Sequence, residues 1–128
     1  MRTILVVDDD PWVRVLARDV LAGDGYRVLE ASDGQDAIRV AAEHPGPIHL
    51  LLTDVVMPGM NGCELAAGLV PVLPGLKVMF MSAYDRDFLV TSGLNPIGPV
   101  ITKPFTTEYL SRRVRMVLDR QPEATPAR

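Results

Sequence analysis

The run Thr3-Ile4-Leu5-Val6-Val7-Asp8-Asp9-Asp10-Pro11 sets the pattern for the whole chain, because a short apolar segment ends abruptly on three acids. Residues Thr3 to Val7 show no polar alternation after the first position, which is typical of a strand covered on both faces. Pro11 favours the first turn of a helix, and apolar residues then recur at helical spacing until Gly23 and Gly25 end the pattern. This run therefore predicts a strand, an acidic turn and a helix.

The rest of the chain repeats this alternation. We predict further strands over residues 26–30, 48–53, 76–81 and 100–101, and further helices that begin at a Ser32–Gln35 capping box, run from Cys63 to about Val70, and begin near Thr106. Glycines and prolines interrupt residues 85–99, so we expect a short or irregular fourth helix there.

Five strand-like runs that alternate with helices predict an α/β fold, in which a doubly wound parallel sheet carries helices on both faces. A chain of 128 residues matches one domain, which we expect over residues 1–120. Residues 121–128 contain two prolines and no core pattern, which indicates a flexible tail or linker remnant.

Composition gives no reason to expect a nucleic acid, a membrane or a disulfide. A net charge of -3 gives no reason to expect nucleic acid or an anionic membrane surface as a partner. No apolar run approaches the roughly 18 to 20 residues that cross a bilayer, so we expect a cytoplasmic protein. The single cysteine, Cys63, has no second thiol with which to form a disulfide, and we interpret it as a small half-buried residue.

Polar residues follow the predicted strands at the point where each strand ends. They are Asp8 and Asp9, Asp54, Ser82 and Lys103. Because ligands of such sheets bind beyond the carboxyl ends of the strands, we expect these side chains to share one site.

The residue types at this site indicate phosphoryl chemistry. Three carboxylates repel one another by about 4 kcal/mol per pair at 4 Å and an effective dielectric near 20, so a cation is needed. Oxygen ligands without paired histidines suit Mg²⁺, which often completes its shell on phosphate oxygens. Lys103 would add a positive charge and Ser82 a hydrogen bond, and a carboxylate at a strand end can attack phosphorus to form an acyl phosphate.

Four motifs carry a resemblance that covers Ile4 to about Leu118. They are Val6-Val7-Asp8-Asp9-Asp10, Leu51-Leu52-Thr53-Asp54-Val55-Val56-Met57-Pro58-Gly59-Met60-Asn61-Gly62, Met81-Ser82-Ala83-Tyr84 and Lys103-Pro104-Phe105. In this order and spacing, the chain resembles a receiver domain of bacterial two-component signalling. The resemblance implies a flavodoxin-like sheet with strand order 2-1-3-4-5.

The resemblance also implies a role for each site residue. Asp54 would accept a phosphoryl group from a phosphohistidine on a sensor histidine kinase or a phosphotransfer protein. Asp8, Asp9, Asp54 and the backbone carbonyl of Val56 would hold Mg²⁺, with Asp8 acting directly or through water. Ser82 would be the switch hydroxyl and Lys103 the phosphate-binding lysine. Such a domain is not an enzyme beyond assisting its own phosphorylation and dephosphorylation, and is expected to be a monomer or weak dimer.

Two alternatives remain open from the residues alone. Asp8-Asp9-Asp10 also satisfies the Asp-x-Asp loop of a phosphohydrolase with an aspartate nucleophile, although no acidic metal pair follows Lys103. A receiver-like interaction module that is not phosphorylated is the other alternative.

The chain departs from many receivers in two places. Val100 stands where many of them carry an aromatic residue, three positions before the lysine. The interrupted segment 85–99 locally resembles receivers attached to hybrid histidine kinases.

Other conspicuous residues have simpler interpretations. Asp10, directly before Pro11, is expected to cap the first helix. The methionines at 57, 60, 79 and 81 are expected to pack in the core. We expect His44 and His49 to be surface residues, and the arginines of the last helix to form its solvated face.

Overall fold

Five parallel strands form the centre of the fold, in a computed structural model that describes residues 1–120. The strands are β1 (Thr3–Val7), β2 (Arg27–Ala31), β3 (Leu50–Asp54), β4 (Lys77–Ser82) and β5 (Val100–Thr102). They pair in the order β2-β1-β3-β4-β5, so the predicted parallel sheet and its strand order are confirmed. The predicted tail, residues 121–128, lies outside the described residues.

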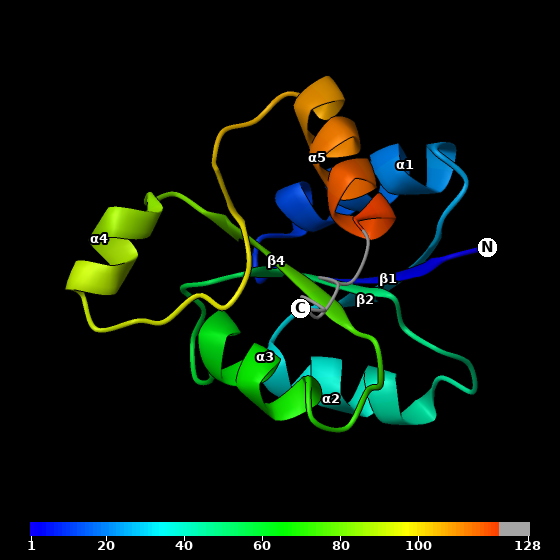
Figure 1. The fold of residues 1–128 in the computed structure, drawn as a ribbon, viewed down its shortest axis with the longest axis horizontal. Coiled ribbons are helices and arrows are strands. Elements are labelled where there is room, and N and C mark those ends of the chain that lie inside the picture. Colours follow the sequence, from blue (N-terminus) through cyan, green and yellow to red (C-terminus); the bar gives the residue numbers. More distant parts are fainter. Residues whose placement is uncertain (121–128) are drawn as a thin grey trace, which may run out of the picture.

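Helices cover both faces of this sheet, as Figure 1 shows. They are α1 (Pro11–Gly23), α2 (Gly34–Glu43), α3 (Gly62–Leu69), α4 (Arg86–Thr91) and α5 (Thr107–Asp119). One face carries α1 and α5, and the opposite face carries α2 and α3. The fourth helix has six residues, which confirms that it is short.

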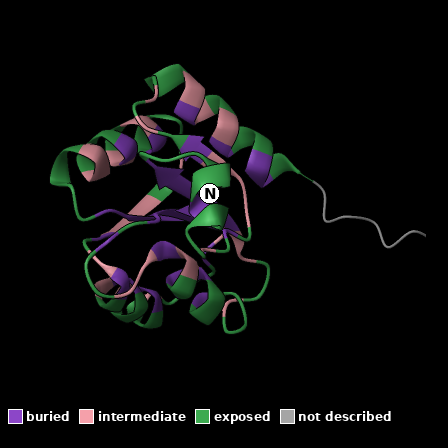
Figure 2. Ribbon diagram, turned by 90° about the vertical axis from the view of Figure 1, so that its left-hand side faces the viewer, coloured by how far each residue is buried: buried purple, intermediate pink, exposed green. Residues whose placement is uncertain are grey.

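Strand β1 explains why the sheet needs two helical layers. Leu5 and Val7 pack into the hydrophobic cluster on the α2 and α3 side, whereas Ile4 and Val6 pack into the cluster on the α1 and α5 side. All four side chains are fully buried, and Figure 2 shows this buried sheet between the two partly exposed helical layers. Burial of each such side chain stabilises the fold by roughly 1.5–3 kcal/mol, so the apolar runs fix the arrangement of layers.

The starts of the helices follow the predicted caps with one exception. The side chains of Asp10 and Thr106 accept hydrogen bonds from the first turns of α1 and α5, as expected. The predicted Ser32–Gln35 capping box is wrong, because Asp33 is the cap of α2 and accepts from the Asp36 backbone N–H at 2.8 Å. The other predicted ends of strands and helices differ from the observed ones by no more than about two residues, within the usual uncertainty of such boundaries.

His49 corrects another prediction. It is half-buried rather than a surface residue, and its Nδ1 accepts a hydrogen bond from the backbone N–H of Thr3 at 2.9 Å. The cause is the pairing of β1 with β3, which places Ile4 opposite Leu50 and so brings His49 beside Thr3. His44 is likewise half-buried, so the expectation of a surface residue is wrong there too.

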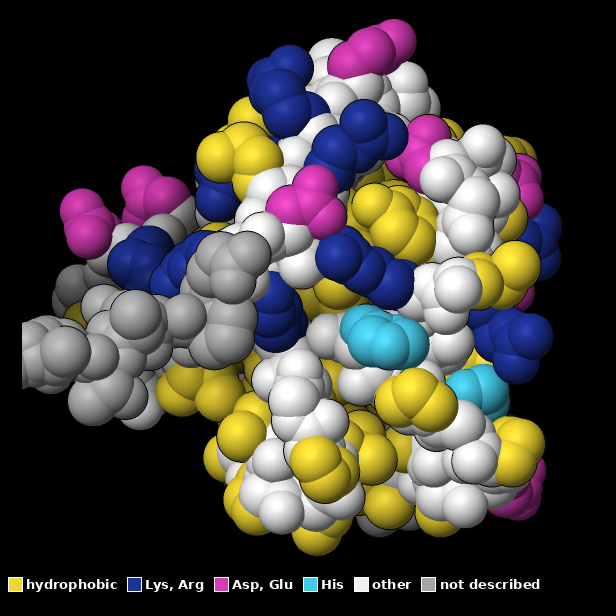
Figure 3. Space-filling model, turned by 45° about the vertical axis from the view of Figure 1, so that its right-hand side comes forward, with side chains coloured by type: hydrophobic (Ala, Val, Ile, Leu, Met, Phe, Trp, Pro, Cys, Tyr) yellow, Lys and Arg dark blue, Asp and Glu magenta, His cyan; other side chains and the backbone are white. Residues whose placement is uncertain are grey.

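The two helical layers expose different kinds of side chain. Figure 3 shows basic side chains gathered over the α1 and α5 side of one face, and hydrophobic side chains over the α2 and α3 side. On α5, Arg112 and Arg115 are exposed as predicted, whereas Arg113 is half-buried and donates to the Tyr109 hydroxyl at 3.1 Å. No helix among the residues that the structure describes is long and apolar enough to cross a membrane.

Candidate functional site

The site forms where the strands end together. Asp54 is the last residue of β3 and Ser82 the last residue of β4, while Asp8 directly follows β1 and Lys103 directly follows β5. The parallel pairing sets Asp54 beside Met81 and Ser82 beside Thr102, so these ends lie at one edge of the sheet. Four strands far apart in sequence thus bring their ends to one edge of the sheet.

Three acids meet at this edge of the sheet. Asp8, Asp9 and Asp54 each offer a carboxylate oxygen, and these oxygens lie within 4.8 Å of one another. Asp8 is fully buried and Asp54 is 7% exposed, whereas Asp9 is exposed. A compact set of carboxylates, one of them exposed, is the ligand type that Mg²⁺ takes in proteins, so these residues fit that ion.

Lys103 balances part of this negative charge. Its Nζ lies 2.8 Å from Asp8 Oδ2 and 3.4 Å from Asp54 Oδ2. Partial burial lowers the pKa of Lys103, but the hydrogen bond to Asp8 and the nearby charges of Asp54 and Asp8 outweigh it and hold the pKa above its usual value. The lysine therefore stays charged between the two carboxylates.

The environment of Asp54 makes it a stronger base than an ordinary aspartate. Burial, with a second contribution from the negative charge of Asp8, raises its pKa to about 6, while Lys103 acts in the opposite direction. At neutral pH the carboxylate is still largely ionised, and it is poorly solvated. A carboxylate in this condition is suited to nucleophilic attack.

Ser82 is the last residue of β4, at the end of the strand that the sequence predicts there. Its hydroxyl is almost fully buried, and its oxygen accepts a hydrogen bond from the Tyr84 backbone N–H at 2.9 Å, so it caps the following turn. A hydroxyl group has one proton and two lone pairs, so this bond leaves the proton of Ser82 able to serve another acceptor.

Val56 lies two residues beyond Asp54, exposed at the start of the β3–α3 loop, and the role of its carbonyl stays a prediction.

Gly62 closes the loop that follows Asp54. Its backbone N–H donates to the Val55 carbonyl at 2.8 Å. A Cβ at position 62 would lie 2.1 Å from the backbone oxygen of Asp54, so a larger residue would displace the backbone of the acid itself. The Asn61-Gly62 pair indicated only a turn, and sequence reasoning missed this close approach.

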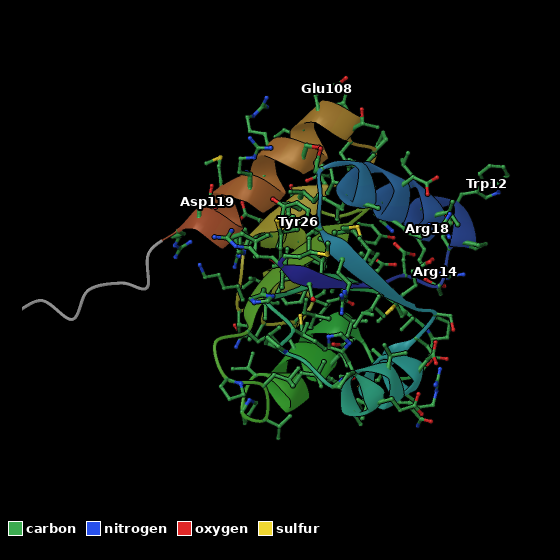
Figure 4. The ribbon with its side chains drawn as sticks, turned by 90° about the vertical axis from the view of Figure 1, so that its right-hand side faces the viewer. Trp12, Arg14, Arg18, Tyr26, Glu108 and Asp119 are labelled. Atoms are coloured by element: carbon green, nitrogen blue, oxygen red, sulfur yellow. The ribbon has the colours of Figure 1, made fainter. Side chains whose placement is uncertain are left out.

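Arg14 is a second residue that sequence reasoning missed. Its Nη1 donates to the backbone carbonyl of Asp8 at 2.7 Å. Figure 4 labels Arg14 and Arg18 on α1, with Trp12 extending away from the body of the protein. An arginine one turn into an amphipathic helix looks like any solvated residue, so no local signal singles it out.

Comparison with known proteins decides the family. The family model described as "Response regulator receiver domain" matches residues 4–115. The chain belongs to this receiver family. Receiver domains are the regulatory phosphoacceptors of two-component signalling, which favours this class over a phosphohydrolase.

Individual relatives support the same assignment. The receiver is 34% identical over 119 residues to the response regulator receiver protein CpdR of Brucella abortus (strain 2308), covering 92% of this chain and 98% of CpdR. It is also similar to the crystal structure of the receiver domain from the hybrid histidine kinase CckA, with a TM-score of 0.76, 36% identity and coverage of 91% and 98%. The expected likeness to receivers of hybrid kinases is thus confirmed.

A further solved structure bears on the metal. The receiver resembles the response regulator TrrA from Thermotoga maritima in complex with Mg²⁺ and BeF, with a TM-score of 0.74, 28% identity and coverage of 91% and 99%. Other curated relatives are longer, and this chain spans between 13% of the sensor kinase CckA of Brucella abortus and about half of several transcriptional regulators.

Proposed function

We propose that this receiver takes a phosphoryl group onto Asp54 from a phosphohistidine of a sensor histidine kinase or a histidine phosphotransfer protein. The observation that carries the proposal is the position of the Asp54 carboxylate. It is nearly buried, it shares the acidic cluster with Asp8 and Asp9, and it lies 3.4 Å from the Lys103 ammonium group. We further propose that the domain works in the cytoplasm as a monomer or weak dimer.

The chemistry is a transfer between two nucleophiles. A carboxylate oxygen of ionised Asp54 attacks phosphorus, a P–O bond forms, and the P–N bond to the histidine of the partner breaks. The electron pair of that bond stays on the imidazole nitrogen, which then takes a proton from solvent. The product is an acyl phosphate on Asp54 and a neutral histidine on the partner.

The residues of the pocket prepare this transfer. Asp8, Asp9, Asp54 and the backbone carbonyl of Val56 would hold Mg²⁺, which when bound neutralises negative charge on the carboxylates and on the phosphoryl oxygens. The Lys103 ammonium group already lies between two carboxylates, so it is placed to bind a phosphoryl oxygen on Asp54. The Ser82 hydroxyl would donate a hydrogen bond to another of these oxygens.

Labelling with a small phosphodonor tests the proposal. The purified chain is treated with acetyl phosphate and Mg²⁺, and its mass is measured by mass spectrometry. We expect the mass to rise by one phosphoryl group in the wild type and in Asp10→Asn, whose side chain caps α1, and to stay unchanged in Asp54→Asn. Labelling of Asp54→Asn as strong as that of the wild type would contradict the assignment.

The same experiment separates the alternatives. A phosphohydrolase with its nucleophile in the Asp8-Asp9-Asp10 loop would still be labelled by acetyl phosphate, or still hydrolyse it, in Asp54→Asn. An interaction module without phosphorylation would show neither label nor turnover. Binding of beryllofluoride, a phosphoryl mimic, in the wild type with Mg²⁺ but not in Asp54→Asn would add an independent measure of the intact site.

A further inference from the structure

A network of charged side chains lies behind the acidic loop, between α1 and the end of β2. Arg14 Nε lies 3.5 Å from Glu30 Oε1, and Arg18 Nη1 lies 3.2 Å from Glu30 Oε2. Arg14 also donates through Nη1 to the backbone carbonyl of Asp8 at 2.7 Å. Arg14 and Glu30 are both partly buried, with 20% and 28% of their side chains exposed, so the contact is only partly screened by solvent. Arg14 therefore joins the loop of the site to the sheet.

The three acids differ in how their positions are fixed. Asp54 belongs to a central strand, and the Asp8 carboxylate accepts from Lys103 at 2.8 Å and from the Asp10 backbone N–H at 2.9 Å. The exposed side chain of Asp9 has no recorded hydrogen bond or ion pair within residues 1–120. The position of Asp9 therefore depends on the backbone that carries it.

The hydrogen bond of Arg14 acts on that backbone. The carbonyl of Asp8 and the N–H of Asp9 belong to one planar peptide group. A hydrogen bond that holds the carbonyl therefore also fixes the orientation of the backbone N–H of Asp9. A guanidinium group donates in a fixed fork, and this geometry lets Arg14 hold the carbonyl while it pairs with Glu30. Glu30 in turn holds the guanidinium group through its contact with Nε.

We propose that Arg14, held by Glu30, is a positioning residue that orients the Asp8–Asp9 peptide group and so prepares Asp9 to bind the divalent cation. The inference rests on the proposed function, because it assumes that the acidic cluster takes Mg²⁺. Arg14 would touch neither the metal nor the phosphoryl group. Groups that orient metal ligands from behind typically contribute about 10–100-fold to metal affinity, although they never contact the ion.

Direct titration with Mg²⁺ by isothermal calorimetry tests this role in the full chain without phosphodonor. Arg14→Met keeps most of the apolar stem but removes the donor, and we expect its dissociation constant for Mg²⁺ to rise about tenfold or more. Arg18→Met is the matched control, because it loses the contact with Glu30 but does not contact Asp8. Its affinity should stay within about twofold of the wild type.

A second readout separates positioning from general loss of structure. The initial rate of phosphorylation by acetyl phosphate is measured against Mg²⁺ concentration. We expect Arg14→Met to require more Mg²⁺ for its half-maximal rate, yet to approach the wild-type rate at saturation, because Asp54 and Lys103 are unchanged. Arg14→Lys, which keeps the charge but not the fork, should fall between the wild type and Arg14→Met in affinity.

The outcomes distinguish this inference from the proposed function. If the wild type binds Mg²⁺ and Arg14→Met binds it within about twofold as tightly, the positioning role is wrong and the proposed function stands. If the wild type binds no Mg²⁺, both are wrong. Should Arg14→Met not fold, Arg14→Lys decides, because affinity equal to that of the wild type would show that the fork is not needed.

Discussion

Replacement of Asp54 by asparagine should stabilise the fold at neutral pH in the absence of metal. The folded domain raises the pKa of Asp54 from 3.8 to about 6, through burial and the nearby charge of Asp8. Between these two pH values the folded state binds more protons than the unfolded state, so its stability falls as the pH rises. Above about pH 6 the full destabilisation is present. At 1.36 kcal/mol per pKa unit, a shift of about two units corresponds to roughly 3 kcal/mol, which is an upper limit because the pocket opens to solvent.

Urea unfolding in EDTA measures this effect directly. The free energy of unfolding of Asp54→Asn and of the wild type is compared at pH 4, 6 and 8. We expect a gain of about 1–3 kcal/mol for the variant at pH 8, which shrinks toward zero at pH 4, where the wild-type carboxyl is protonated. Glu108→Gln is the control, because this exposed carboxylate of α5 has no recorded ion pair within residues 1–120, and changes at such sites are usually within about 0.5 kcal/mol. A difference between variant and wild type that is absent, or independent of pH, would refute the reasoning.

Four further outcomes follow from the same contacts. Phosphorylation by acetyl phosphate at limiting Mg²⁺ should slow as the pH falls through about 6, because the pKa of Asp54 is raised in the metal-free site and its protonation both removes the nucleophile and competes with the ion; a flat rate from pH 5 to 8 would contradict this. Lys103→Met should lower the stability in EDTA by about 3 kcal/mol, because it leaves the buried Asp8 without its partner, and Mg²⁺ should restore part of the loss in a thermal unfolding assay. Gly62→Ala should lower the free energy of unfolding in urea by about 1–3 kcal/mol or more, because the added Cβ would clash with the Asp54 carbonyl. Hydrogen exchange in residues 84–99 should slow when beryllofluoride binds, and unchanged high protection there would place the switch elsewhere.

Most of the site could be predicted from the sequence because a parallel sheet places the carboxyl ends of its strands side by side. Asp8, Asp54 and Lys103 lie far apart in the chain, yet each sits at the carboxyl end of an apolar run. Parallel strands place such ends at one edge of the sheet, so the meeting of these residues follows from the strand pattern alone. No knowledge of side-chain packing is needed for that step.

The remaining features depend on contacts that no local pattern encodes. The hydrogen bond of Arg14 to Asp8 depends on how α1 packs beside β2. The hydrogen bond from Thr3 to His49 depends on the register of β3 against β1. At α2 the pattern of a capping box was present, but the cap lies one residue later and the bonds are not those of such a box. Asp33 accepts from Asp36, whose carboxylate accepts in turn from the Ser32 backbone N–H. A propensity gives the type of cap, whereas the geometry of the preceding turn chooses between neighbouring residues.

Ser82 shows what kind of switch these contacts allow. Its oxygen already accepts from the Tyr84 backbone N–H, so donating its proton to a phosphoryl oxygen on Asp54 adds one bond without breaking another. One hydrogen bond to a charged group contributes about 1.5–3 kcal/mol, whereas moving a population from 1:99 to 99:1 takes roughly 5.5 kcal/mol. Val100 is half-buried and has no polar group to supply the difference. Unless Lys103 contributes the remainder, phosphorylation should tighten the segment after Ser82 by degrees rather than exchange two rigid packings.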